Sequence, residues 1–301
     1  MKTSYTPDEI VEILQNLLAV DAKSVQQLTE GHSSQVYSFT AINGQKLVLR
    51  IRESEKDLLA DKYAYDHFGS SLPIPQIMGI GKLPAIGYYC ISEFIDGQTL
   101  YSLDGQALHD LLPRFHQMLV NTFTLNVSGT HGYGSIDVAT GNALADSWKS
   151  SLRSELESLD VDLLKTHAAN IALEADMINR LVEQFNSNLP YASEVRRLLH
   201  GDPGYDNVIV DEGKIKAVID WEQMAYGDWA RDFSRFEYFD IADCGDMLTF
   251  GMENGLEIEH LHERKALYWA INALRDIEFA SSQKNQQVAA RLRANLGKRL
   301  I

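Results

Sequence analysis

The sequence predicts an α+β fold of two lobes, in which an antiparallel strand-rich lobe over residues 1–97 precedes a mainly helical lobe over residues 98–301. Asn43-Gly44 separates two β-rich runs, and this dipeptide between such runs is a strong hairpin signal. From about residue 104 onward the apolar residues recur at helical spacing instead. The chain therefore separates its strands and helices along the sequence, with Gly97 as the hinge between the lobes.

The first lobe is expected to begin with a helix whose apolar face consists of Ile10, Ile13, Leu14, Leu17 and Leu18. Thr6 is placed to cap it, Pro7 suits the first turn, and Glu9 completes a capping box. A proline-rich stretch at residues 72–75 ends a second helix, because proline and its preceding residue disfavour helix. The remaining elements expected in this lobe are a hairpin over residues 35–51, that second helix over 55–68, and strands over 77–83 and 87–95.

The second lobe is expected to be helical, with one hairpin inside it. Val208-Ile209-Val210 is typical of a strand, Asp211-Glu212-Gly213 of a turn, and residues 215–219 of the returning strand. The helices are expected over residues 104–121, 142–159, 167–187 and 259–280.

The composition excludes several classes of protein. The chain has 301 residues, a net charge of −15 and 2 cysteines, so nucleic acid is an improbable partner and no disulfide framework is indicated. No apolar run reaches the roughly 20 residues that span a bilayer, and Glu9, Glu12 and Asp21 interrupt the apolar residues that a signal peptide requires. We expect a cytoplasmic protein without a membrane partner; the oligomeric state is open, with a monomer favoured.

Acidic residues are concentrated in one part of the chain. Residues 200–263 contain 16 Asp and Glu against 4 Lys and Arg. A cleft lined by one sign of charge attracts ligands of the opposite sign, so this segment suits a cationic substrate. A solvated acidic surface that contains a few catalytic acids explains the same count, and the sequence does not decide between the two.

The run from His200 to Asn207, followed by Ile219-Asp220-Trp221-Glu222, carries the chemistry. Asp202 precedes Asn207 by five positions and Asp220 by eighteen. Protein kinases use the same order of parts for metal-assisted phosphoryl transfer, and the intervening hairpin would bring Asn207 and Asp220 to one end. Carboxylate and amide oxygens are ligands that Mg²⁺ accepts. A turn is the alternative, but a turn does not require this spacing.

Two residues are candidates for structural support of the Asp202 loop. His200 follows two leucines and precedes the loop, so we interpret it as a residue that holds the loop backbone rather than as an acid or base. Asp232 is placed to brace the loop from the start of a helix, with a simple N-cap as the alternative.

The first lobe must supply contacts for the phosphates of a nucleotide. Ser33 and Ser34 follow Gly31 just before the first hairpin strand, where hydroxyl and backbone N–H groups could cover phosphates. Arg50 is a lone cation in an apolar strand, and Asp61 on the following helix is the best-placed partner for it. A snorkelling surface arginine is the alternative.

These residues resemble the aminoglycoside phosphotransferases, antibiotic kinases with a protein-kinase-like fold. The resemblance rests on His200-Gly201-Asp202 with Asn207, Ile219-Asp220-Trp221-Glu222 and Gly227-Asp228, and it covers roughly residues 25–230. Several further segments are similar to the hygromycin B phosphotransferases: Leu28–Gly31, Val48–Arg50, Leu72–Pro75, Tyr89–Ser92 and Glu194–Leu199.

The resemblance implies roles for individual positions. Asp202 would be the catalytic base, and Asn207 and Asp220 the Mg²⁺ ligands. The linker from Glu93 to Ile95 would bind the nucleotide base through its backbone. Arg50 falls where most of the family has the nucleotide lysine, and Asp61 where it has that lysine's glutamate partner; Arg can replace Lys there because it grips phosphate bidentately.

The implied reaction transfers the γ-phosphoryl group of ATP, with GTP not excluded, to a hydroxyl of an aminoglycoside, hygromycin B above all. Acidic residues are candidates for its ammonium groups, namely Asp202, Asp206, Glu222, Glu237, Asp240, Asp243, Asp276 and Glu278. Two alternatives remain. One is a metabolic kinase of this fold acting on choline, an amino alcohol, a sugar or a macrolide. An aromatic cage would favour a quaternary ammonium acceptor, and candidates for it are Trp221, Tyr226, Trp229, Phe236 and Tyr238. The other is a non-catalytic nucleotide-binding protein.

Overall fold

The computed structural model describes residues 5–28, 34–83, 86–239, 245–283 and 285–299. The chain forms two compact units. The first contains Met1–Phe115 and Gly204–Glu222, and the second contains His116–Pro203 and Gln223–Ile301. The first unit thus extends beyond residue 97 and includes the second hairpin, because that hairpin pairs with the short strand β6 (Gln98–Thr99).

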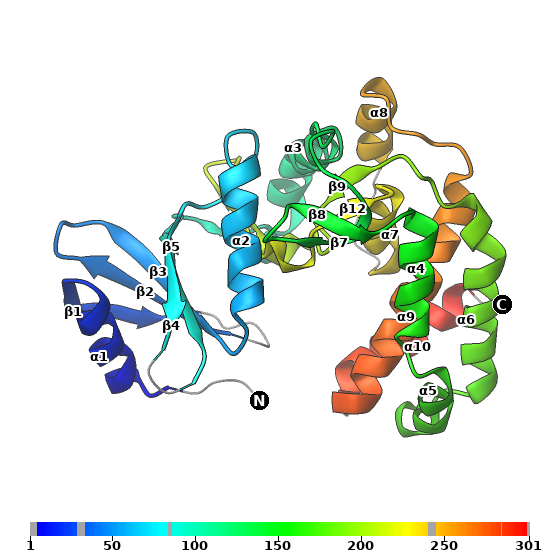
Figure 1. Ribbon diagram of the computed structural model, residues 1–301, viewed down its shortest axis with the longest axis horizontal. Helices are drawn as coiled ribbons and strands as arrows, with labels where there is room; N and C mark the ends of the chain where they lie inside the picture. Colours follow the sequence, from blue (N-terminus) through cyan, green and yellow to red (C-terminus); the bar gives the residue numbers. More distant parts are fainter. Residues whose placement is uncertain (1–4, 29–33, 84–85, 240–244, 284, 300–301) are drawn as a thin grey trace. The chain divides into compact units, whose positions relative to one another are not determined.

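The first unit is built on a five-stranded antiparallel sheet (Figure 1). Its strands lie in the order β1-β2-β3-β5-β4, and the expected first hairpin is confirmed, with Thr40 opposite Lys46. Gly44 turns this hairpin at φ +86°, a conformation that an L-residue adopts only at a cost. The strand bounds are Val20–Gln27 for β1, Gln35–Ala41 for β2, Lys46–Arg52 for β3, Ile77–Lys82 for β4 and Tyr88–Glu93 for β5.

The two faces of this sheet have different roles. Helix α1 (Pro7–Leu17), with the expected Thr6–Glu9 capping box, packs on the apolar face, where Leu49 and Ile51 are buried. Because side chains alternate along a strand, Arg50 lies on the opposite face of β3. There it forms an ion pair with Asp61 of helix α2 (Glu55–Phe68), whose bounds match the expected ones. Strand alternation therefore separates the apolar core from the charged residues.

A three-stranded sheet completes the first unit, in the order β11-β10-β6. Strands β10 (Val208–Asp211) and β11 (Lys214–Val218) form the expected second hairpin, with Val208 opposite Val218. At its open end the Ile219 N–H donates to the Asn207 carbonyl oxygen at 2.9 Å. The Val218 N–H donates to Pro73 O at 2.7 Å, so the hairpin is also tied to the segment after α2.

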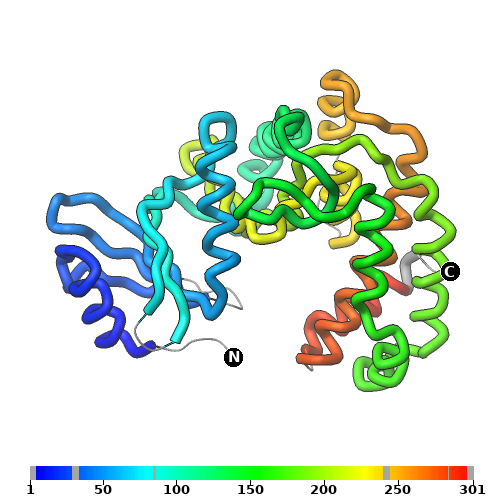
Figure 2. The backbone as a smooth tube through the Cα atoms, viewed as in Figure 1, coloured from blue at the N-terminus to red at the C-terminus, as the bar shows by residue number. Residues whose placement is uncertain are grey.

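The second unit is mainly helical. Helix α9 packs against α5, α6, α7 and α10 (Figure 2), and every residue from 267 to 274 is buried, as expected of a core helix. None of the described helices combines the length and the apolar character needed to cross a bilayer. Its helices are α4 (Trp148–Glu157), α5 (Val161–Ala168), α6 (Ala175–Asn188), α7 (Ala230–Tyr238), α8 (Gly245–Glu253), α9 (Leu261–Gln283) and α10 (Gln286–Arg299), and α3 (Gly105–Phe123) contains the boundary between the units.

The secondary structure of the second unit differs from the expectation in two helical segments. The helix expected over 142–159 begins as a strand, and that expected over 167–187 is two helices joined by a 3₁₀ turn. A four-stranded sheet was also not anticipated; it has the order β8-β7-β12-β9. Its strands are three to five residues long, so local periodicity carries little signal for them. Strands β7 and β8 form a local hairpin with Asp137 opposite Asn142, whereas β12 pairs with β7 and with β9 across long stretches of the chain. They are β7 (Tyr133–Asp137), β8 (Asn142–Ala145), β9 (Arg197–Leu199) and β12 (Ala225–Gly227).

Candidate active site

Asp202 lies in the second unit, in the loop that leaves strand β9. The loop turns at Gly201, whose φ of +87° is in the left-handed region. A Cβ at this glycine would lie 2.8 Å from Gln223 Cβ and closer still to the Gln223 carbonyl oxygen, so no other residue fits without a shift of the backbone. The Asp202 side chain is 33% exposed, which leaves it accessible at the end of a tightly constrained turn.

Asp232 holds the backbone of this loop. Its carboxylate is fully buried at the start of α7 and accepts hydrogen bonds from the His200 N–H at 2.8 Å and the Gly201 N–H at 3.2 Å. Burial raises the pKa of Asp232 to about 6, although these amide hydrogen bonds act in the opposite direction. The geometry is that of a brace for the loop, and a bracing role for Asp232 stays a prediction.

His200 is buried and contributes to the same turn. Its Nδ1 accepts a hydrogen bond from the Asp202 N–H at 3.2 Å. A ring nitrogen that accepts from the backbone two residues later fixes the direction of the loop, and it suits the structural interpretation of His200 rather than acid–base chemistry.

Arg235 is a neighbour of Asp202 that sequence reasoning missed. Its guanidinium Nη2 lies 2.5 Å from Asp202 Oδ1. Arg235 follows Asp232 by three positions, so the two side chains share one face of α7. That spacing is the signal that could have found it, once Asp232 had been assigned to the loop.

Asn207 and Asp220 both lie in the first unit, at the open end of the second hairpin. Asn207 is buried at the end of a 3₁₀ turn over Tyr205–Asn207. Asp220 has a φ of +67°, which is uncommon for a residue that is not glycine. A residue other than glycine in this left-handed region of φ costs about 1–3 kcal/mol, and such residues are concentrated at functional sites. The expected metal ligand Asp220 is thus held in an unfavourable backbone conformation.

The expected partnership of Arg50 and Asp61 is present. Besides this ion pair, Asp61 accepts a hydrogen bond from the Trp221 N–H at 2.8 Å, and Arg50 Nη1 lies 3.6 Å from Asp220 Oδ1. Burial lowers the pKa of Arg50, and the Asp220 carboxylate opposes that effect. The pair thus links β3, α2 and the Asp220 segment.

Arg52 is a second cation at this position that sequence reasoning missed. It is 5% exposed and contacts Asp57 at 3.2 Å, Asp220 at 3.4 Å and the Glu222 carboxylate. The spacing to Arg50 is two residues, which places both side chains on one face of β3. Asp220 is therefore flanked by two guanidinium groups.

The donor set at the hairpin end fits a hard divalent cation. Asp220 offers carboxylate oxygens, and Asn207, whose carbonyl accepts from the residue before Asp220, offers an amide oxygen. Within the described part of the chain no group of three His, Cys, Asp or Glu residues is arranged to hold a metal ion. A cation here would consequently depend on nucleotide phosphates and water for its other ligands, as Mg²⁺ commonly does.

The remaining residues expected to contact nucleotide are placed as follows. Ser34 is buried immediately before β2, whereas Ser33 lies outside the described residues. In the linker, the Glu93 N–H donates to Gln76 O at 2.9 Å and the Phe94 N–H to Lys46 O at 3.4 Å. These two amides serve the sheet, and base recognition by the linker from Glu93 to Ile95 stays a prediction.

Most of the described acids expected to bind ammonium groups are already paired with internal cations. Glu237 binds Lys265, and Asp276 binds Arg291 at 2.9 Å and the Tyr238 hydroxyl at 2.8 Å. Asp202 and Glu222 are paired with the arginines described above. Asp206 and Glu278 are exposed, and Asp240 and Asp243 lie outside the described residues. Within each unit, most of the described acids in this set are therefore engaged by an arginine or a lysine.

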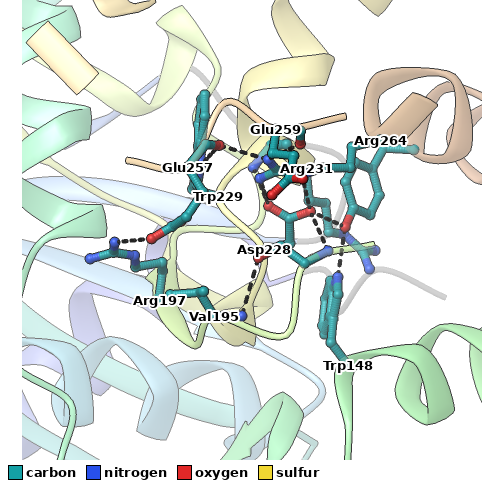
Figure 3. Close-up of polar contacts among 12 residues, drawn as sticks. Trp148, Val195, Arg197, Asp228, Trp229, Arg231, Glu257, Glu259 and Arg264 are labelled. Carbon is teal, nitrogen blue, oxygen red and sulfur yellow. Dashed lines mark hydrogen bonds and ion pairs between the residues drawn. The ribbon is translucent and has the colours of Figure 1, made fainter. Parts of the chain in front are cut away.

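A buried network anchors the start of α7 to α9. Asp228, fully buried two residues before α7, accepts hydrogen bonds from Arg264 Nε at 2.8 Å and from the Tyr268 hydroxyl at 2.7 Å (Figure 3). The Trp148 indole N–H in turn donates to the Tyr268 hydroxyl at 2.7 Å. Because α7 carries Asp232 and Arg235, this network fixes the helix that supports the Asp202 loop.

The chain belongs to the phosphotransferase enzyme family, whose model matches residues 24–249. It is 30% identical over 209 residues to hygromycin-B 4-O-kinase of Escherichia coli. This match covers 68% of the chain and 59% of the relative's length.

Solved structures show the same fold. A crystal structure of aminoglycoside phosphotransferase APH(4)-Ia superposes with a TM-score of 0.78 and 24% identity, and the match covers 97% of this chain and 98% of that one. The macrolide 2′-phosphotransferase MphH from Brachybacterium faecium gives a TM-score of 0.66 and 15% identity, with 96% of this chain and 98% of that one covered. At these identities the likeness shows the kinase-like α+β fold alone.

Proposed function

We propose that this protein is an aminoglycoside O-phosphotransferase that transfers the γ-phosphoryl group of ATP to a hydroxyl of hygromycin B or a close relative. The observation that carries the proposal is the 30% identity to hygromycin-B 4-O-kinase over 209 residues. That aligned length spans 59% of the relative, so the activity of the whole relative is an inference for this chain. Resistance to the antibiotic would follow from the reaction, and a cytoplasmic site of action would give access to ATP.

Asp202 is proposed to orient the acceptor hydroxyl and accept its proton. In phosphoryl transfer the protein mainly positions the reactants and stabilises charge, so a carboxylate beside the attacking oxygen is the expected group. The constrained Gly201 turn and the Asp232 hydrogen bonds support this role, because they hold the Asp202 backbone in one place. A rigid support of this kind limits the positions from which the carboxylate can meet the hydroxyl.

Asn207 and Asp220 are proposed to hold Mg²⁺, which when bound neutralises charge on the nucleotide phosphates. Arg50 is proposed to contact those phosphates. Its ion pair with Asp61 supports this role, because a partner carboxylate keeps a buried guanidinium in a fixed orientation.

An aminoglycoside is favoured over choline as the acceptor. The aromatic residues that would suit a quaternary ammonium ion are each no more than 1% exposed and belong to the hydrophobic core of their units: Trp221, Tyr226, Trp229, Phe236 and Tyr238. A ring buried in the core cannot present its face to a ligand. The acidic segment, by contrast, suits a polycation, which would have to compete with the internal cations for the carboxylates.

The experiment is release of nucleoside diphosphate by the purified chain with Mg²⁺, with ATP and GTP tested in parallel. The acceptors are hygromycin B, other aminoglycosides, a macrolide and choline, and Asp202→Asn is the control that lacks the proposed base. Saturable turnover on hygromycin B that the variant loses would support the proposal. Turnover confined to another acceptor would reassign the substrate, and nucleotide binding without turnover on any acceptor would overturn the enzymatic function.

A further inference from the structure

Arg235 forms an ion pair with Asp202, the carboxylate proposed as the base. Arg235 and Asp202 lie on different elements of the second unit, helix α7 and the loop after β9. Their 2.5 Å contact is between a side chain that is 21% exposed and one that is 33% exposed. Partial burial of both groups weakens the competition from water, so the contact can restrict the carboxylate more than a surface ion pair would.

Helix α7 contacts the loop at two points from one face. Asp232 binds the loop backbone through the His200 and Gly201 amides, and Arg235, three residues later on the same face, binds the Asp202 side chain. Because α7 is itself anchored through Asp228 to Arg264, both contacts are made from a fixed helix. The backbone and the side chain of Asp202 are thus oriented by a single element.

Arg235 is in turn held by an aromatic ring one turn further along the same face. The guanidinium carbon lies 5.2 Å from the centroid of the Phe239 ring, and the Arg291 guanidinium of α10 lies 4.6 Å from the same centroid. A planar guanidinium that packs on an aromatic ring keeps fewer rotamers than one surrounded by water. Phe239 therefore limits the directions in which Arg235 can point.

We propose that Arg235 is a positioning residue that orients the Asp202 carboxylate for the acceptor hydroxyl. The role rests on the proposed function, because it requires Asp202 to be the group that meets the hydroxyl. Arg235 is not assigned a contact with nucleotide or acceptor. Its loss should reduce the rate of transfer and leave the binding of both substrates nearly intact.

The test compares Arg235→Met and Arg235→Lys with a matched control, Arg275→Met. Arg275 also contacts a carboxylate of the second unit at 2.5 Å, Glu155, but not the Asp202 loop. We expect kcat of Arg235→Met to fall about 10- to 100-fold with KM for ATP and for the acceptor changed less than threefold. Arg235→Lys should recover part of the rate, and Arg275→Met should keep that of the unsubstituted protein.

A double variant separates positioning from a merely structural role. If Arg235 acts through Asp202, Arg235→Met should cause no further loss of the residual rate of Asp202→Asn, measured in single turnovers with excess enzyme. Guanidinium ion should raise the rate of Arg235→Met but not of Arg275→Met. A kcat within twofold of the unsubstituted protein, or an equal loss in both backgrounds, would overturn the proposal. A variant with an unchanged kcat and a lower KM for the cationic acceptor would also overturn the proposal. That result would mean that the Arg235 guanidinium only competes with an ammonium group of the acceptor for the Asp202 carboxylate.

Failure of the proposed function has a different signature. Each variant is also measured for ATP hydrolysis without acceptor, where water replaces the acceptor hydroxyl. If the unsubstituted protein phosphorylates no antibiotic but hydrolyses ATP in an Asp202-dependent manner, the acceptor assignment fails. The role of Arg235 is then tested by the hydrolysis rate of each variant relative to that of the unsubstituted protein.

Discussion

Replacing Gly201 by alanine tests whether the Asp202 loop is as constrained as its geometry indicates. Alanine at φ +87° costs about 1–2 kcal/mol, because its Cβ crowds the neighbouring carbonyl oxygen. At this position the Cβ would also overlap Gln223, so the loop must move. Movement weakens the hydrogen bonds that the His200 and Gly201 amides donate to Asp232, and a hydrogen bond to a charged group contributes about 1.5–3 kcal/mol. We therefore expect a total destabilisation of about 2.5–5 kcal/mol.

Gly255 provides the matched control within the same unit. Its φ is +76°, and a Cβ there would meet no atom within 4 Å. Gly255→Ala should therefore show the backbone cost alone, about 1–2 kcal/mol. Urea unfolding followed by tryptophan fluorescence gives both free energies, and phosphoryl transfer should be lost in Gly201→Ala and kept in Gly255→Ala. If the two variants differ by less than about 0.5 kcal/mol, the close approach to Gln223 does not constrain the loop and the reasoning is refuted.

Three further results are expected. Burial alone would raise the pKa of Glu155, but the guanidinium groups of Arg231 and Arg275 outweigh it and lower that pKa from 4.5 to about 2. The ionised Glu155 should therefore contribute about 3 kcal/mol to the free energy of unfolding above pH 4.5, and this contribution should be lost as the pH falls toward 2. The gap in unfolding free energy between the unsubstituted protein and Glu155→Gln should narrow over that range, and a constant gap would contradict the assignment. Asp228→Asn should destabilise the protein by about 3–5 kcal/mol in urea unfolding, because it leaves the buried Arg264 without its counter-ion; a loss below about 1 kcal/mol would show that the network relaxes. Asn207→Ala should raise the Mg²⁺ concentration needed for half-maximal nucleotide binding, measured by calorimetry, and an unchanged requirement would remove Asn207 from the ligand set.

Local patterns in the sequence predicted the elements whose signals lie within a few residues. The capping box at Thr6 and Glu9 placed α1, and Asn43-Gly44 placed the first hairpin. The bounds of α2 were also predicted correctly, because a run of helix formers ends before the prolines at 73 and 75. In each case the interactions that stabilise the element connect residues close in the chain, so the sequence determines it without knowledge of the fold.

The sequence by itself also supplied the candidate residues for the chemistry, through the spacing of Asp202, Asn207 and Asp220, and it correctly paired Arg50 with Asp61. Only the tertiary structure decided which groups surround the carboxylates. Arg235 reaches Asp202 from 33 residues away, and Arg52 reaches Asp220 from 168 residues away. No periodicity encodes such contacts, because they depend on how α7 packs near the loop and on which face of β3 meets the hairpin. The candidate residues are thus set by local sequence, and their electrostatic surroundings are set by packing between segments distant in the chain.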